Sequence, residues 1–139
     1  MDRELLSVAG GTKPADVVIT GGRIVNVYTG EIYDGGVAIS NQTIAAVGDV
    51  DYCIGEGTCT IDAEGAFITP GFIDGHIHPE SSDLAIRPFA EAVLKHGTTS
   101  IMTDLHEVGV VSGLPGIEAV LEENKITDLN LYFVVPSHV

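Results

Sequence analysis

The sequence predicts a mixed α/β chain in two parts, a β-rich segment over 1–69 and an alternating strand–helix segment over 70–139. Up to residue 69, short runs rich in Val, Ile and Thr are separated by Gly, Asn and Asp, a pattern typical of strands and turns. From residue 70 onward, apolar strand-like runs alternate with helix-like runs. Such alternation predicts a parallel sheet with right-handed crossovers.

The first part is interpreted as an antiparallel meander or a small β-sandwich. Its glycine pairs are interpreted as turns, because they do not open a helix in the way that a phosphate-binding glycine loop does. Turns are expected at Gly21-Gly22, at Asp34-Gly35-Gly36 and at Asn41-Gln42. The strands expected between these turns cover residues 15–20, 23–30, 37–40, 43–48, 58–62 and 66–69.

The second part predicts three strands and two helices. Pro88 suits the first turn of the first helix, and Gly97 suits its C-terminal end. The last strand is a nearly continuous apolar run, as expected where both faces of a sheet are covered. In chain order we expect a strand over 72–78, a helix over 87–97, a strand over 98–105, a helix over 114–125 and a strand over 129–137.

Composition excludes some classes of partner. The chain of 139 residues has 20 acidic and 6 basic residues, a formal charge of −14. This balance argues against nucleic acid or an anionic membrane surface, since both call for clustered Lys and Arg. No signal peptide or apolar run of about 20 residues is seen. We therefore expect a soluble cytoplasmic protein, with Cys53 and Cys59 as reduced thiols rather than a disulfide.

Two histidines end the first expected strand of the second part. His76 and His78 are two residues apart, so on a strand they share one face and aim both imidazoles at one point. Imidazole is the commonest protein ligand for a divalent metal, so the pair predicts a metal site. The alternative is two buried histidines that are hydrogen-bonded to neighbouring carbonyl groups.

Three motifs give a more specific resemblance. The run PGFIDGHIH over 70–78 continues into Glu80-Ser81-Ser82, giving HxHxESS. The run HGTT follows at 96–99 and DLHE at 104–107, where Leu105 replaces the proline of a DPHE motif. Together they resemble the start of the amidohydrolase superfamily and, within it, the adenine deaminase family.

That resemblance implies a (β/α)8 barrel with a metal centre at its mouth and hydrolytic deamination of adenine, a small purine base, in purine salvage. It implies a pair of divalent metals, Mn²⁺ or Fe²⁺, with His76 and His78 as metal ligands. Substrate-facing or metal-supporting roles fall on Glu80, Ser81, Asp104, His106 and Glu107, with Ser137 also at a strand end. Two alternatives remain open: Glu80 caps the following helix, and Asp104 orients a loop by accepting backbone N–H groups.

Length limits what the chain can do alone. A full (β/α)8 barrel takes roughly 200 residues or more, and residues 70–139 suffice only for its first three strands and two helices. The resemblance also implies ligands on later strands. We therefore expect an incomplete barrel with little turnover, either forming a homo-oligomer or associating with the missing barrel segment. The alternatives are another metal-dependent amidohydrolase acting on a cyclic amide, of the dihydroorotase or hydantoinase kind, and a non-catalytic fragment that binds a partner chain.

Overall fold

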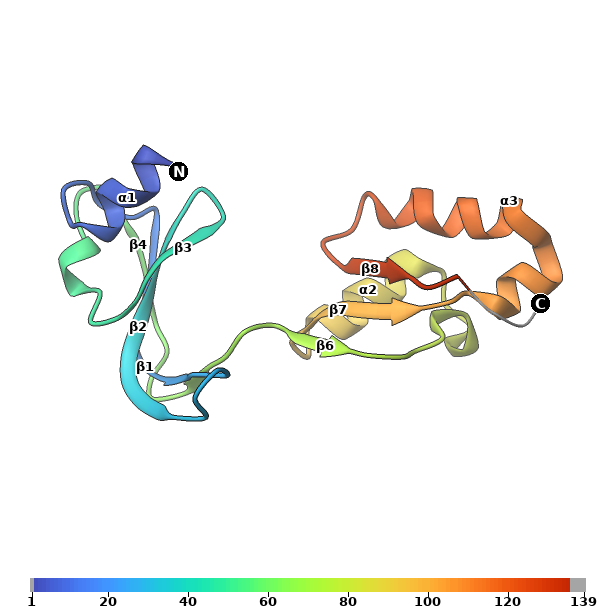
Figure 1. Ribbon diagram of the computed structural model, residues 1–139, viewed down its shortest axis with the longest axis horizontal. Coiled ribbons are helices and arrows are strands. Elements are labelled where there is room, and N and C mark those ends of the chain that lie inside the picture. Colours follow the sequence, from blue (N-terminus) through green and yellow to red (C-terminus); the bar gives the residue numbers. More distant parts are fainter. Residues whose placement is uncertain (1, 136–139) are drawn as a thin grey trace. The chain divides into compact units, whose positions relative to one another are not determined.

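The computed structural model describes residues 2–135 and divides into two compact units, Met1–Thr69 and Pro70–Val139. The division falls at Pro70, where the sequence pattern changes. The fold is mixed α/β, as predicted, with one sheet in each unit (Figure 1). Ser137 and His138 lie outside the described residues. Within 2–135 no helix is both long enough and apolar enough to cross a membrane.

The first unit has a five-stranded sheet in which β1 is central. The strand order is β3-β2-β1-β4, and β5 also pairs with β1. β1, β2 and β3 form the predicted antiparallel meander, but β4 and β5 run parallel to β1, so a wholly antiparallel arrangement is wrong. The described part of this unit has one sheet, so the sandwich stays a prediction. The elements are α1 (Arg3–Ala9), β1 (Val17–Val25), β2 (Ile32–Ser40), β3 (Thr43–Gly48), η1 (Asp51–Cys53), β4 (Cys59–Asp62) and β5 (Phe67–Ile68).

Two of the expected turns are instead parts of strands. β1 continues through Gly21 and Gly22, where the pairing with β2 shifts register and Gly21 adopts a φ of 65°. A glycine with positive φ at a register shift forms a β-bulge, which bends a strand without ending it. Gly36 lies inside β2, where a side chain would collide with the Ile19 carbonyl oxygen. The turn at 41–42 is confirmed, with positive φ at both residues.

The core of the first unit lies between α1 and the sheet. Val8 of α1 packs with Val18, Ala38, Val50 and Cys53, all of them buried. The free thiol of Cys53 is therefore enclosed, whereas the second free cysteine, at position 59, is exposed. Burial of this apolar group gives the unit a core of its own.

The second unit is a three-stranded parallel sheet in the order β6-β7-β8, with helices in the connections. Three strands alternating with two helices were predicted, and the structure confirms them. A four-residue 3₁₀ helix, η2, precedes the first of these helices. The elements are β6 (Phe72–Asp74), η2 (Pro79–Ser82), α2 (Ile86–Leu94), β7 (Thr98–Thr103), α3 (His106–Asn124) and β8 (Asn130–Phe133).

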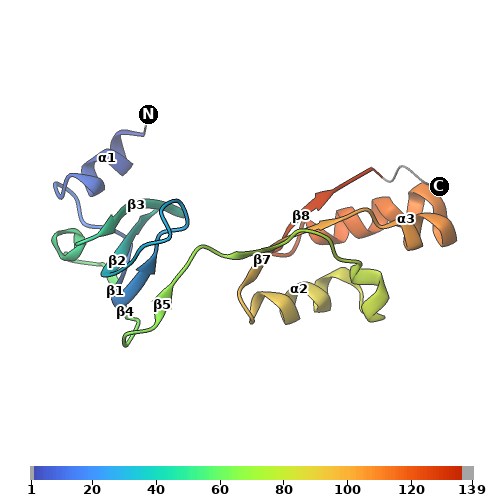
Figure 2. The same cartoon turned by 60° about the horizontal axis from the view of Figure 1, so that its bottom comes forward.

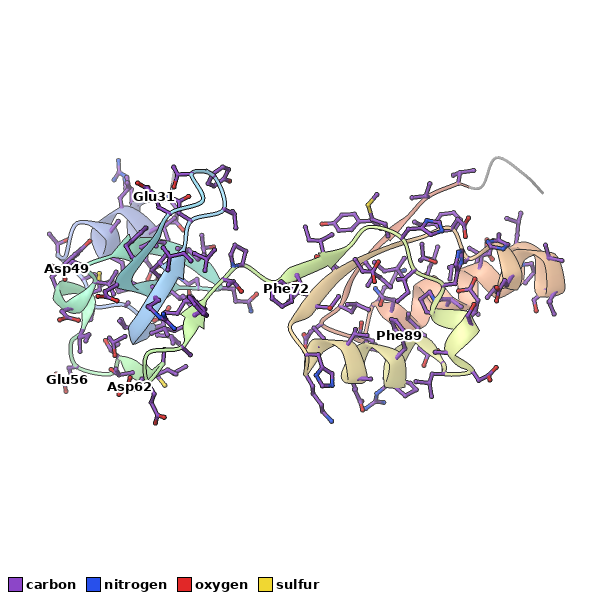
Figure 3. The ribbon with its side chains drawn as sticks, turned by 90° about the horizontal axis from the view of Figure 1, so that it is seen from below. Glu31, Asp49, Glu56, Asp62, Phe72 and Phe89 are labelled. Carbon is purple, nitrogen blue, oxygen red and sulfur yellow. The ribbon has the colours of Figure 1, made fainter. Side chains whose placement is uncertain are left out.

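Both helices pack on one face of this sheet (Figure 2). Phe89 of α2, labelled in Figure 3, is buried with Ile101 of β7 and Leu129. Val93 follows Phe89 by four residues and packs against the same cluster, as does Val120 of α3. The i, i+4 spacing thus places the apolar side of α2 on the sheet, as the pattern predicted.

Three expected boundaries in the second unit are wrong. The last strand, β8, ends at Phe133 although it was expected to continue to residue 137. β6 ends at Asp74 rather than continuing to residue 78. α3 begins at His106 rather than at 114, and its path is broken at Gly113, where φ is 62° and ψ is −161°. The apolar period detected only the portion after this break, because Gly113 and Pro115 interrupt the pattern.

Candidate metal centre

The two histidines of the HxH motif converge from a turn, not from a strand. Asp74 Oδ1 accepts a hydrogen bond from the backbone N–H of His76 at 3.1 Å. The backbone N–H of Ile77 then donates to the Met102 carbonyl at 3.0 Å, which ties the turn to β7. The Nε2 atoms of His76 and His78 lie 3.0 Å apart, with their rings edge to face. The predicted convergence is therefore present although the expected strand has ended.

A matching unit follows β7, the neighbouring parallel strand. Asp104 Oδ1 accepts a hydrogen bond from the backbone N–H of His106 at 3.2 Å and lies 2.9 Å from its ring Nδ1. Leu105 between them is buried and has a φ of 50°, which turns the chain from β7 into α3. Asp104 thus orients the loop by accepting a backbone N–H group, as the alternative interpretation predicted, and its side chain also contacts the ring of His106.

The contact between Asp104 and His106 shifts both pKa values. The hydrogen bond from His106 holds the pKa of the Asp104 carboxyl below its usual value, against the opposing effect of desolvation. The same hydrogen bond raises the pKa of His106, and the charges of Asp104, Glu107 and Glu80 add to that rise. The pair therefore favours a carboxylate beside an imidazolium.

The two turns meet around His78. One ligand atom each from His78, Asp104 and His106 lies within 4.8 Å of the others, and the rings of His78 and His106 are 4.7 Å apart, edge to face. His78 Nδ1 is 3.5 Å from Asp104 Oδ1 and 3.7 Å from Glu80 Oε1. Within residues 2–135, His78 Nδ1 and both carboxylate oxygens of Glu80 are buried and have no hydrogen-bond partner. Buried polar atoms normally have partners, and the carboxylates of Glu80 and Asp104 beside His78 place negative charge here that favours a cation at this site.

Ser81 and Glu107 join the segment after β6 to the start of α3. Ser81 Oγ is 3.1 Å and 3.2 Å from the two carboxylate oxygens of Glu107 and donates to them. Seven of the eight residues expected from the sequence follow the C-terminal ends of β6 and β7, and the eighth, Ser137, lies outside the described residues. The seven are His76, His78, Glu80, Ser81, Asp104, His106 and Glu107.

Sequence reasoning missed the structural roles of Asp74 and Leu105. Asp74 holds the His76 backbone, and Leu105 makes the reversal that brings Asp104 and His106 together. A signal for the first was present, since Asp-x-His occurs at the end of both strands. No pattern in the sequence signalled the positive φ of Leu105.

Comparisons with curated proteins find relatives along nearly the whole chain. No family model matches the chain. An adenine deaminase of Moorella thermoacetica is 47% identical over 137 residues, which is 99% of this chain and 23% of that protein. An adenine deaminase of Listeria monocytogenes is 44% identical over 99% of this chain and 23% of its own length. The chain thus spans about a quarter of the length of these relatives.

Solved structures point to the same class. A D-aminoacylase, studied for its binuclear metal centre, matches with a TM-score of 0.68 and 21% identity over 88% of this chain and 30% of its own. An L-hydantoinase from Arthrobacter aurescens matches with a TM-score of 0.52 and 30% identity over 64% of this chain and 20% of its own. In fold, the chain resembles a portion of these amidohydrolases. Within that class, its sequence resembles the N-terminal portion of the adenine deaminases.

Proposed function

We propose that this chain is the N-terminal part of a metal-dependent enzyme that hydrolyses adenine to hypoxanthine and ammonia. The observation that carries the proposal is the approach of the Nε2 atoms of His76 and His78 to 3.0 Å, at the end of a strand in a parallel sheet. Identity of 44–47% with adenine deaminases along nearly the whole chain supports adenine as the substrate.

The second unit supplies the first three strands and two helices of a (β/α)8 barrel in this proposal. Its strands are parallel, its helices pack on one face, and the chemistry-bearing side chains lie at the C-terminal strand ends. That is the arrangement on which active sites of such barrels are built. The first unit, 1–69, then supplies part of a β-sandwich.

His76 and His78 would hold a divalent cation, Mn²⁺ or Fe²⁺, through their Nε2 atoms, as part of a binuclear centre. Such a cation would supply Lewis-acid chemistry, lowering the pKa of a water molecule that it coordinates to about 7 in good cases. The unpartnered oxygens of Glu80 and the carboxylate of Asp104 place negative charge beside the histidines, which favours a cation there.

The remaining residues suit the proton movements of the reaction. Hydrolysis forms a C–O bond at C6 of adenine and breaks the C–N bond to the amino group. Protons must reach a ring nitrogen and the departing ammonia. His106 has a raised pKa and is held by Asp104, so it is a group that can store a proton near the site. Ser81 and Glu107 tie the two turns together.

Two histidines alone hold a divalent cation weakly, so we expect the isolated chain to release little ammonia. The test measures the release of ammonia from adenine, with Mn²⁺ or Fe²⁺, by two proteins. One is this chain alone, and the other is a full-length chimera in which this chain is joined to the remaining part of an adenine deaminase relative. The chimera should release ammonia and lose that activity when His76 and His78 are replaced by alanine. Robust turnover by the isolated chain would contradict the incomplete site, and an inactive chimera would contradict the deaminase proposal.

Hydrolysis of a cyclic amide is the second candidate, favoured by the structural likeness to L-hydantoinase. Enzymes that act on carboxylate-bearing cyclic amides need a cation to hold the carboxylate. The residues directly after the HxH motif are Pro79 and Glu80, which suit a neutral base better than an anion. Assaying the chimera with dihydroorotate and hydantoin beside adenine separates the two candidates.

A non-catalytic chain that binds a partner is the third candidate. It draws on the sheet of the second unit, whose edge strands within the described residues are β6 and β8. Unpaired strand edges can add a strand from another chain. We propose that β8 is the edge through which the chain associates, either with a second copy or with the rest of the barrel.

A further inference from the structure

The ring of His78 has two nitrogen atoms with different surroundings. Its Nε2 faces His76 Nε2 at 3.0 Å, whereas its Nδ1 is buried and has no hydrogen-bond partner among the described residues. A cation at the Nε2 atoms needs a lone pair on each of them. The proton of neutral His78 then has to be on Nδ1, because a neutral imidazole carries one proton.

Two carboxylates lie near that Nδ1 proton. Asp104 Oδ1 is 3.5 Å away and Glu80 Oε1 is 3.7 Å away, both somewhat beyond hydrogen-bond length. Asp104 Oδ1 already accepts two hydrogen bonds from His106. In the part of the chain that the structure describes, neither oxygen of Glu80 has a hydrogen-bond partner, so Glu80 is the acceptor with free capacity.

The placement of Glu80 disagrees with a simple helix-capping role. Glu80 lies in the first turn of η2, where an acidic side chain interacts favourably with the helix dipole. Such a residue normally keeps its carboxylate in solvent. The Glu80 side chain is only 12% exposed, and both of its oxygens are buried. Its burial on the Nδ1 side of His78 is accounted for if the carboxylate serves that ring.

We propose that Glu80 is a positioning residue, whose carboxylate accepts the Nδ1 proton of His78 and so fixes the tautomer and orientation in which Nε2 binds the cation. This inference rests on the proposed metal site. A shift of less than about 1 Å in the Glu80 side chain completes the hydrogen bond. A carboxylate on the far nitrogen of a ligating histidine makes the ligating nitrogen more basic, and losing such a partner typically lowers metal affinity by about 10–100-fold.

The test measures metal binding and the His78 tautomer on the 139-residue chain. Co²⁺ serves as the probe, because its absorption spectrum reports histidine ligation, and ¹⁵N spectra of the metal-free chain report which ring nitrogen carries the proton. Glu80→Gln should lower Co²⁺ affinity by about 10–100-fold and mix the His78 tautomers. Glu91→Gln is the matched control: it removes the same charge from an exposed position on α2 and should change neither.

The outcomes separate this inference from the proposed function. If the wild-type chain binds no Co²⁺, or binds it equally well after His76→Ala and His78→Ala, the metal-site proposal fails. If the wild type binds through these histidines and Glu80→Gln leaves affinity and tautomer unchanged, only the role of Glu80 is overturned. If Glu80→Gln does not fold, the wild-type spectrum decides: a dominant Nδ1–H tautomer supports the role, and a dominant Nε2–H tautomer overturns it.

Discussion

At the ends of β6 and β7 the same three-residue unit, Asp-x-His, performs the same local task. In each Asp-x-His turn the aspartate accepts a hydrogen bond from the backbone N–H of the histidine two residues later. This short turn fixes the position of the histidine backbone, so the backbone largely determines where the imidazole lies. Because β6 and β7 are neighbouring parallel strands, the two Asp-x-His turns lie close together, and His78 lies near Asp104 and His106.

Loss of either HxH imidazole should weaken metal binding. We expect His76→Ala and His78→Ala each to lower Mn²⁺ or Co²⁺ affinity at least about tenfold, since each removes one of two candidate ligand atoms. Isothermal titration calorimetry measures the affinity. His96→Ala, after the end of α2, serves as the control and should bind as the wild type does. Equal affinity for all four proteins would rule out the HxH pair as the binding site.

The pH dependence of the second pair follows from its shifted pKa values. His106 has a raised pKa, so its contribution to stability is complete below 6.5 and is lost as the pH rises through the folded value. Asp104 has a lowered pKa, so its contribution is present above 3.8 and is lost as the pH falls through the folded value. The metal-free pair of Asp104 and His106 therefore stabilises the fold most between pH 3.8 and pH 6.5.

Replacing Asp104 should lower the pKa of His106. In Asp104→Asn the carboxylate that stabilises the imidazolium is gone, so the protonated ring loses its main partner. An NMR titration of the metal-free chain measures the change in the pKa of His106. An unchanged pKa for His106 would show that the pair does not form in solution.

At the level of elements, α3 is two helical segments joined at Gly113. Its φ of 62° and ψ of −161° lie in a region that is essentially restricted to glycine. The first segment carries His106 and Glu107 at the site, and Val120 in the second packs on the core. The break at Gly113 lets one element serve both positions.

A side chain at the break should destabilise the second unit. Gly113→Ala forces a residue with a Cβ into a glycine conformation, and we expect a loss of about 1–3 kcal/mol in the free energy of unfolding. Urea denaturation followed by circular dichroism measures it. Gly109→Ala is the matched control: it lies in the same helix without a positive φ, its Cβ would meet the flexible end of the Ile117 side chain at 3.3 Å, and it should change the free energy of unfolding by less than about 1 kcal/mol. A wild-type midpoint for Gly113→Ala would contradict the break.

At the scale of the whole chain, each unit has a core of its own and the two cores share no residue. The sheet of the second unit is covered by helices on one face, while large apolar side chains remain exposed on its strands. Ile73 is 68% exposed and Tyr132 is 56% exposed. Exposed apolar residues along an edge strand favour association with another chain.

A charge on the β8 edge should reduce self-association. Tyr132→Lys places a lysine on that edge strand, and lysine opposes edge-to-edge pairing. Size-exclusion chromatography with light scattering should show a smaller average mass than for the wild type at equal concentration. Tyr28→Lys makes the same change in a turn of the first unit, where the tyrosine is 97% exposed, and should leave the mass unchanged. A monomeric wild type would contradict self-association through this edge.

The sequence by itself determined the change of architecture at Pro70, the alternation of strands and helices after it, and the HxH pair. These features follow from the local spacing of apolar residues and of the two histidines, and that spacing does not depend on what the chain packs against. Only the tertiary structure decided that β6 stops at Asp74, that Gly21-Gly22 is a bulge and that Leu105 turns back on itself. It also placed the Glu80 carboxylate beside His78. Those features depend on which strand lies alongside and on what is buried there, and no local pattern encodes such contacts.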